Sequence, residues 1–245
     1  MQKLRLRYAK RGPLRFTSHR DVARAFERAL RRAGVPMAFS QGFSPHPKIS
    51  WVGASPTGVA SEAEYVEIQV VERVDPIALV PGLDAALPTG LDVLEAVPAG
   101  AGSLTERIEA SRWRIELPGV PAETLRAAAG RLLDAETVEV ERLTKQGMRL
   151  IDVRPAVVTA DVSAGAEACG ILEVVVRQLT PAVRPDDVMS ALRVVAALVP
   201  PVPAKATRMA QGRLDDGGGL SDPLAQDRAA ASGRALREPP RSDVD

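Results

Sequence analysis

The amino-acid sequence predicts an α+β protein in which antiparallel sheets carry helices on one face. One observation is that segments with a two-residue hydrophobic period are interleaved with segments whose apolar residues recur at helical spacing. A second is the stretch PAGAGS at residues 98–103, which has no large apolar side chain and separates two halves of the chain. A third is that strand and helix patterns resume after this break. Together these observations favour two domains of the same class.

In the first half, charged residues alternate with Leu4, Leu6 and Tyr8, which predicts a strand over residues 3–8. A helix is expected over residues 19–33, beginning after Ser18 and stopped by the Gly34 turn. The remaining expected elements are extended segments at 37–39, 48–53 and 64–71, a helix at 75–87 and a strand at 91–97.

These elements follow one another in the order βαββαβ, which is the order of the split βαβ, or ferredoxin-like, unit. We therefore expect residues 1–98 to form one ferredoxin-like domain, residues 99–111 a linker and residues 112–213 a second, decorated domain of the same kind. Residues 214–245 contain three consecutive glycines, scattered charges and few large apolar groups. Such a segment gains too little from burial to offset the entropy of ordering, so we expect a flexible, disordered C-terminal tail.

The second half is expected to contain strands near residues 113–117, 138–140, 150–153, 157–162 and 171–176, and helices near residues 125–133 and 186–198.

The composition shows that the chain lacks the residues for several kinds of chemical site. Of 245 residues only Cys169 is a cysteine, so the chain has no internal disulfide, no thiolate zinc site and no three-cysteine iron–sulfur motif. Nucleotide-binding, zinc-protease and hydrolase motifs are missing as well. We expect no metal and no cofactor bound by this chain. Without an apolar leader or a run long enough to cross a bilayer, we also expect a cytoplasmic protein that does not bind membranes.

Positive charge is concentrated at the start of the chain. The whole sequence has 32 Lys and Arg against 31 Asp and Glu, but residues 1–50 have 12 Lys and Arg against Asp21 and Glu27 alone. At roughly 100° per residue, four arginines of the predicted helix fall within about 80° of one another. This arginine ridge consists of Arg20, Arg24, Arg28 and Arg31. It is a candidate contact for nucleic-acid phosphates, together with Lys48; the alternative is the solvated face of an amphipathic helix.

A second candidate site is the segment after the predicted helix, which we call the aromatic loop. It consists of Gln41, Gly42, Phe43, Ser44, Pro45, His46 and Pro47 and is followed by Lys48. Two prolines restrict the backbone around His46, and Gly42 permits a sharp turn before Phe43. We interpret the loop as a contact for a ligand or a partner; the alternative is an ordinary rigid hairpin connection.

Four motifs in the first half support a family resemblance. They are RFTSHRD at residues 15–21, FERALRRAG at 26–34, QGFSPHPKI at 41–49 and SEAEY at 61–65. These motifs closely resemble the radical-SAM-linked (radical SAM-associated) protein family, a domain of unknown function. Its members are fused to, or encoded beside, a radical SAM protein of the cobalamin-binding type. The resemblance implies that the iron–sulfur cluster and SAM belong to that partner, and that this chain has an accessory role around RNA.

We therefore expect an accessory, non-catalytic module that works with a radical SAM enzyme and presents RNA or an RNA-associated substrate. One alternative is a metal-independent RNA endonuclease in which His19 or His46 acts as acid or base and Lys48 or an arginine stabilises the phosphorane. His19, His46 and Lys48 are the candidate catalytic residues. The other alternative is a structural adaptor that binds only protein.

Overall fold

The computed structural model describes residues 1–144 and 147–235, which fall into two compact units. Unit 1 consists of residues 1–106 and of the described residues from 223 onward, and unit 2 consists of residues 107–222. The division between the units lies within the segment predicted as a linker, although residues 110 and 111 already belong to a strand. Both units combine helices with antiparallel strand pairs, so the predicted α+β class is confirmed.

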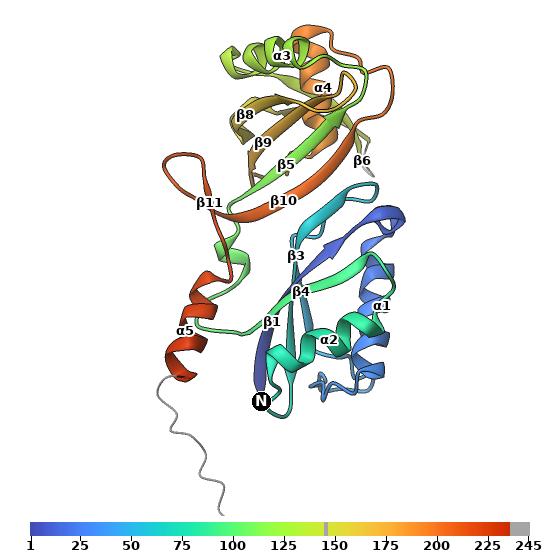
Figure 1. Cartoon of the computed structure of the whole chain (residues 1–245), viewed down its shortest axis with the longest axis vertical. Coiled ribbons are helices and arrows are strands. Elements are labelled where there is room, and N and C mark those ends of the chain that lie inside the picture. Colours follow the sequence, from blue (N-terminus) through green and yellow to red (C-terminus); the bar gives the residue numbers. More distant parts are fainter. Residues whose placement is uncertain (145–146, 236–245) are drawn as a thin grey trace, which may run out of the picture. The chain divides into compact units, whose positions relative to one another are not determined.

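Unit 1 has six main elements in the order βαββαβ (Figure 1). They are β1 (Gln2–Lys10), α1 (His19–Arg32), β2 (Ile49–Val52), β3 (Ala60–Val70), α2 (Pro76–Ala86) and β4 (Leu91–Pro98). Short 3-10 turns, η1 (Gly12–Phe16) and η2 (Thr105–Arg107), connect them to their neighbours. Strands β4, β1 and β3 lie side by side in that order, β2 pairs with β3, and all these pairs are antiparallel.

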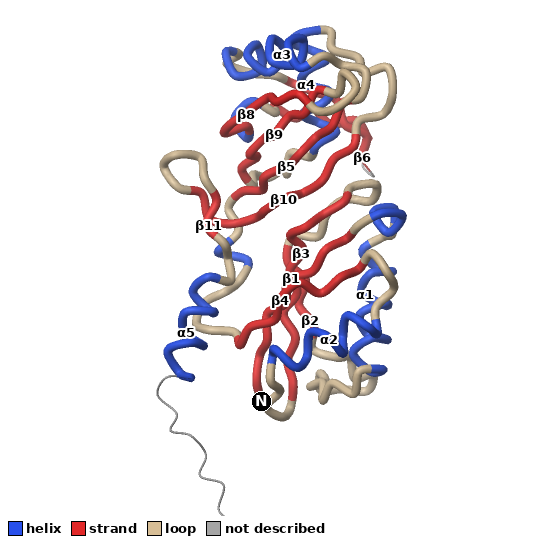
Figure 2. Tube along the Cα trace, viewed as in Figure 1, coloured by secondary structure: helices blue, strands red, loops and turns tan. Residues whose placement is uncertain are grey.

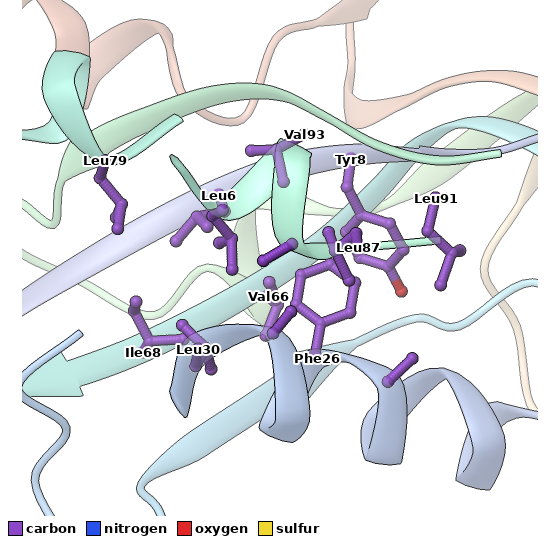
Figure 3. Packing of buried hydrophobic residues seen from close by; sticks show 14 of the residues in the cluster. Leu6, Tyr8, Phe26, Leu30, Val66, Ile68, Leu79, Leu87, Leu91 and Val93 are labelled. Carbon is purple, nitrogen blue, oxygen red and sulfur yellow. The ribbon is translucent and has the colours of Figure 1, made fainter. Parts of the chain in front are cut away.

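Helices α1 and α2 pack on one face of this sheet because both carry apolar side chains at helical spacing. Leu6 and Tyr8 of β1 meet Phe26 and Leu30 of α1 in the core shown in Figure 3. The rings of Tyr8 and Phe26 have centroids 4.7 Å apart, and the ring of Trp51 lies 5.2 Å from that of Phe26. This aromatic cluster fixes α1 against β1 and β2, so the opposite face of α1 points away from the sheet.

The ends of α1 are set by the residues that the sequence indicates. The Ser18 hydroxyl accepts a hydrogen bond from the Asp21 backbone N–H at 3.3 Å, which satisfies one of the free donors of the first turn. At the other end, Gly34 has φ of +65°, a conformation that glycine adopts without strain. The predicted helix boundaries of 19 and 33 are therefore confirmed to within one residue.

Unit 2 contains a sheet in which β10, β5, β9 and β8 lie in that order as antiparallel neighbours (Figure 2). Its elements are β5 (Ala110–Leu117), α3 (Ala122–Asp134), β6 (Glu139–Thr144), β7 (Gly147–Asp152), η3 (Arg154–Ala156), β8 (Val157–Ala164), β9 (Gly170–Arg177), α4 (Pro185–Ala196), β10 (Lys205–Leu214) and β11 (Leu220–Ser221). Strands β6 and β7 form a separate hairpin. Sequence reasoning missed β10, because buried polar residues such as Gln211 interrupt its hydrophobic alternation.

The prediction of a disordered tail over residues 214–245 is wrong for residues 214–235. These residues form the end of β10, the strand β11 and the helix α5 (Ala225–Ala235). Composition misleads here because a buried ion pair helps to hold α5: both carboxylate oxygens of Asp227 accept hydrogen bonds from Nη1 of Arg5, at 3.0 and 2.9 Å. Residues 236–245, the rest of the predicted tail, lie outside the described residues.

Among the described helices, none is both long and apolar enough to span a lipid bilayer.

Candidate functional site

The four arginines of the ridge lie on the face of α1 opposite the core. All four side chains are exposed, whereas Val22, Ala25, Phe26, Ala29 and Leu30 of the same helix are buried. Arg24 makes a long ion pair with Asp21, 3.8 Å between Nη1 and Oδ1. Within the described chain, the guanidinium groups of Arg20, Arg28 and Arg31 have no ion pair and no hydrogen bond. The ridge therefore presents three cations that the fold itself does not use, beside Arg24 with its one long ion pair.

Neighbouring arginines outside the ridge are engaged. Arg32 donates from Nη1 to the Ala86 carbonyl at 3.3 Å, which joins the last turn of α1 to the end of α2. Arg11 pairs with Glu62 and with Asp92, and the hydrogen bond to Glu62 raises the pKa of its guanidinium well above the ordinary value. The ridge arginines differ from Arg11 and Arg32 because they lie on the outer face of α1.

The aromatic loop is closed by a hydrogen-bonded neck at the C-terminal end of α1 (Figure 1). The Ser40 N–H donates to the His46 carbonyl at 2.8 Å, and the His46 N–H donates to the Ser40 hydroxyl at 3.0 Å. Next to this neck, the Lys48 N–H donates to the Ala38 carbonyl, and the Lys48 carbonyl accepts from the Gln69 N–H of β3. The neck is thereby tied to the sheet of unit 1.

Beyond the neck, the tip of the loop is in solvent. Residues 41–46 are all exposed, and the Phe43 side chain reaches 110% relative exposure, the value of a ring without neighbours. Gly42 has φ of +130°, which favours glycine at the turn that the sequence predicts there. The Lys48 side chain is exposed as well. The loop thus combines a hydrogen-bonded neck with an exposed aromatic side chain at its tip.

The two histidines lie in different surroundings. The His19 ring meets the Trp51 ring edge-on, with centroids 5.3 Å apart, at the N-terminal end of α1. His46 belongs to the loop neck at the C-terminal end of α1. His46 precedes Trp51 by five positions, which corresponds to about 16 Å of extended chain at roughly 3.3 Å per residue. This arrangement does not bring His19 and His46 to one reacting phosphate.

Two exposed aromatic residues near the predicted sites were not singled out by sequence reasoning. Phe16 is 61% exposed and has the Arg15 guanidinium 4.6 Å above its ring, and Phe39 is 54% exposed beside the loop neck. Their position within or next to the motifs quoted above was the signal that could have found them. With Phe43, three of the chain's four phenylalanines are exposed. Unit 1 therefore has more aromatic surface than core packing requires.

Two of the hollows in the described chain lie elsewhere, and neither is lined by ridge or loop residues. One, of about 950 Å³, lies in unit 1 among β1, β4, α2 and α5; the other, of about 420 Å³, lies in unit 2 beneath Gly217, Gly218 and Gly219. No group of three or more His, Cys, Asp or Glu side chains within residues 1–144 and 147–235 is arranged to hold a metal ion. The ridge and the loop remain the candidate site.

The sequence matches the model of a known protein family. No curated protein matches the sequence. The family described as "Uncharacterized protein conserved in bacteria (DUF2344)" matches residues 3–185, which include α1, the aromatic loop and most of unit 2. The chain therefore belongs to this bacterial family of uncharacterized proteins.

Proposed function

We propose that this protein is an accessory RNA-binding module that presents RNA, or a substrate attached to RNA, to a radical SAM enzyme. The observation that carries the proposal is the ridge of Arg20, Arg24, Arg28 and Arg31, whose charges point into solvent. Guanidinium groups form bidentate hydrogen bonds with phosphate oxygens and remain charged at any physiological pH. An anionic polymer is the ligand that such a row fits best.

The dimensions and surroundings of the ridge support this proposal. Arg20 and Arg31 are eleven residues apart, which is about 16 Å along a helix that rises 1.5 Å per residue. No acidic residue occurs between Glu27 and Glu62, so residues 28–32 at the end of α1 and the aromatic loop carry only positive charge. A track of this kind attracts polyanions and repels basic surfaces.

The chemistry would reside on the partner, a radical SAM protein of the cobalamin-binding type. The four motifs of residues 15–65 support this assignment through the resemblance described above. A single cysteine cannot hold an iron–sulfur cluster, so cluster and SAM would both be bound by the partner. A cytoplasmic location and the absence of any cofactor on this chain are part of the same proposal.

The proposal also assigns both units to the ferredoxin-like class. The strand order β4, β1, β3 with β2 beside β3 in unit 1 is matched in unit 2 by β10, β5, β9 and β8. The hairpin of β6 and β7 is then the decoration of the second copy. In this view, a tandem of two similar units offers one surface for RNA and leaves a second for the enzyme.

The experiment that tests the proposal is a charge reversal on the ridge. Binding of fluorescent single-stranded RNA to the full chain is measured by anisotropy across a series of salt concentrations. The double variant Arg24→Glu and Arg28→Glu should lose binding while its circular dichroism spectrum stays unchanged. For the wild type, affinity should fall steeply with salt, by a slope of about −0.7 for each phosphate contacted.

A matched control reverses the same number of charges elsewhere. Arg131 of α3 and Arg193 of α4 are exposed, and the variant Arg131→Glu and Arg193→Glu should bind RNA like the wild type. Absent or salt-insensitive RNA binding by the wild type would instead favour the adaptor that binds only protein. Cleavage of RNA by the purified chain in the presence of a metal chelator would establish the endonuclease alternative. Purification of the tagged protein from its own cells would identify the radical SAM partner.

A further inference from the structure

We infer that Phe43 is a stacking platform for an unpaired RNA base, so that the module selects single-stranded RNA rather than any polyanion. This inference rests on the proposed function, since it assigns a substrate class to the same surface. It starts from the exposure of Phe43, whose ring at 110% touches nothing that would hold it in the folded chain. An exposed aromatic ring contributes nothing to the core, so its flat face is available for contact with a ligand.

The Phe43 ring is carried by a loop whose neck is already ordered. The two hydrogen bonds between Ser40 and His46 close the loop, and the Lys48 contacts tie it to β3. Pro45 and Pro47 restrict the backbone on either side of His46. A ligand that contacts Phe43 therefore has to order few additional residues, which lowers the entropic cost of binding.

The charge around the loop favours a polyanion such as a nucleic acid as the occupant. From Arg28 to Ser61 the chain has four basic residues, Arg28, Arg31, Arg32 and Lys48, and no acidic one. The loop lies at the C-terminal end of α1, which is also the end that carries Arg31 (Figure 1). A strand whose phosphates follow the ridge would thus bring its next bases to the loop.

Only an unpaired base can use such a ring. In a duplex both faces of each internal base are already stacked, whereas a single strand can turn a base out onto an aromatic side chain. Because every base has a flat face, stacking of this kind tolerates sequence and distinguishes RNA with exposed bases from a bare sugar–phosphate chain.

The test compares two probes on the full-length protein: a fluorescent single-stranded RNA oligonucleotide and an abasic oligonucleotide of the same length and charge. Wild type should bind the RNA at least about tenfold more tightly than the abasic probe. Phe43→Ala should remove this preference by weakening RNA binding about tenfold and leaving abasic binding unchanged. Phe43→Trp should keep the preference. Ile77→Ala, which removes another exposed apolar side chain of unit 1, should change neither affinity.

The outcomes separate this inference from the proposed function. In one outcome, the Arg24→Glu and Arg28→Glu variant binds neither probe while Phe43→Ala binds both like the wild type. This outcome would support the role of the ridge in binding and overturn the stacking role of Phe43. Equal weakening of both probes by Phe43→Ala would also overturn it, since a base contact cannot affect an abasic strand. If the wild type bound neither the RNA nor the abasic probe, the proposed function itself would be overturned.

Discussion

The arginines of β1 and those of α1 come from the same basic stretch of sequence and lie in the same unit, yet the fold uses them in opposite ways. Arg5 is 2% exposed and donates to Glu67, to Asp227 and to the Gly102 carbonyl. Arg7 donates from Nε to the Glu62 carbonyl at 2.9 Å. Arg28 and Arg31 point into solvent from α1. The excess charge of residues 1–50 thus divides into a part that builds the fold and a part left for a ligand.

This difference has a simple geometric origin. Alternate side chains of β1 point to the face of the sheet that α1 and α2 leave uncovered, and α5 supplies Asp227 there. The outer face of α1 has no partner element of this kind within the described chain of unit 1. A count of charges along the sequence therefore overstates the surface available to a polyanion, and only the charges outside such pairs contribute to a binding footprint.

The largest effect is expected from Asp227→Ala. The substitution leaves the buried Arg5 guanidinium without its bidentate carboxylate, which should cost about 3–5 kcal/mol of unfolding free energy. Urea denaturation measures the loss, and amide exchange along α5 should rise. Asp227→Asn, which keeps a side-chain oxygen that can accept from Arg5, is the control and should lose less stability than Asp227→Ala. An unchanged urea midpoint in Asp227→Ala would show that this ion pair does not anchor α5.

A smaller effect is expected at the start of α1. Ser18→Ala removes the acceptor for the Asp21 N–H and should cost about 1 kcal/mol. Fraying of the first turn would also loosen the position of Arg20, so RNA binding should weaken slightly. Ser18→Asn, which keeps a capping oxygen, is the control and should behave like the wild type in thermal unfolding. A full loss of stability in Ser18→Asn would mean that the hydroxyl acts in another way.

On the ridge, the effect on stability should be smaller still. Arg28→Gln removes a charge that the fold does not pair, and the urea midpoint should correspond to a change within about 0.5 kcal/mol. The matched variant Arg5→Gln removes the ion pair between the guanidinium and the buried Asp227 carboxylate, and should destabilise the protein severalfold more. Equal destabilisation by the two substitutions would contradict the division between structural and available arginines.

The smallest effect is expected for His46→Ala. Its ring is exposed, and the hydrogen bonds of the loop neck use its backbone, which alanine retains. The unfolding free energy should change by less than about 0.5 kcal/mol. Ser40→Ala, which deletes the hydroxyl that accepts from the His46 N–H, should cost more, about 1 kcal/mol. A larger loss in His46→Ala than in Ser40→Ala would show that the imidazole itself holds the loop.

The ridge and the aromatic loop could be found from the sequence, but the contacts that their residues make with distant parts of the chain could not. Helical spacing alone placed the four arginines on one face of α1, and the two prolines with Gly42 indicated a turned, restricted loop. Local periodicity and turn chemistry act over a few residues, so they can be read directly. The contact between His19 and Trp51 joins residues 32 positions apart, and no pattern in the sequence specified it.

The sequence by itself determined the α+β class, the boundaries of α1 and the positions of its cap and stop, because these depend on hydrophobic periods and on the preferences of Ser18 and Gly34. Only the tertiary structure decided that Arg5 is buried and Arg28 is free. It also decided that residues 225–235 form a helix, since Asp227 finds its partner 222 residues away in the sequence. Pairing across such distances depends on how the elements pack and leaves no local signal.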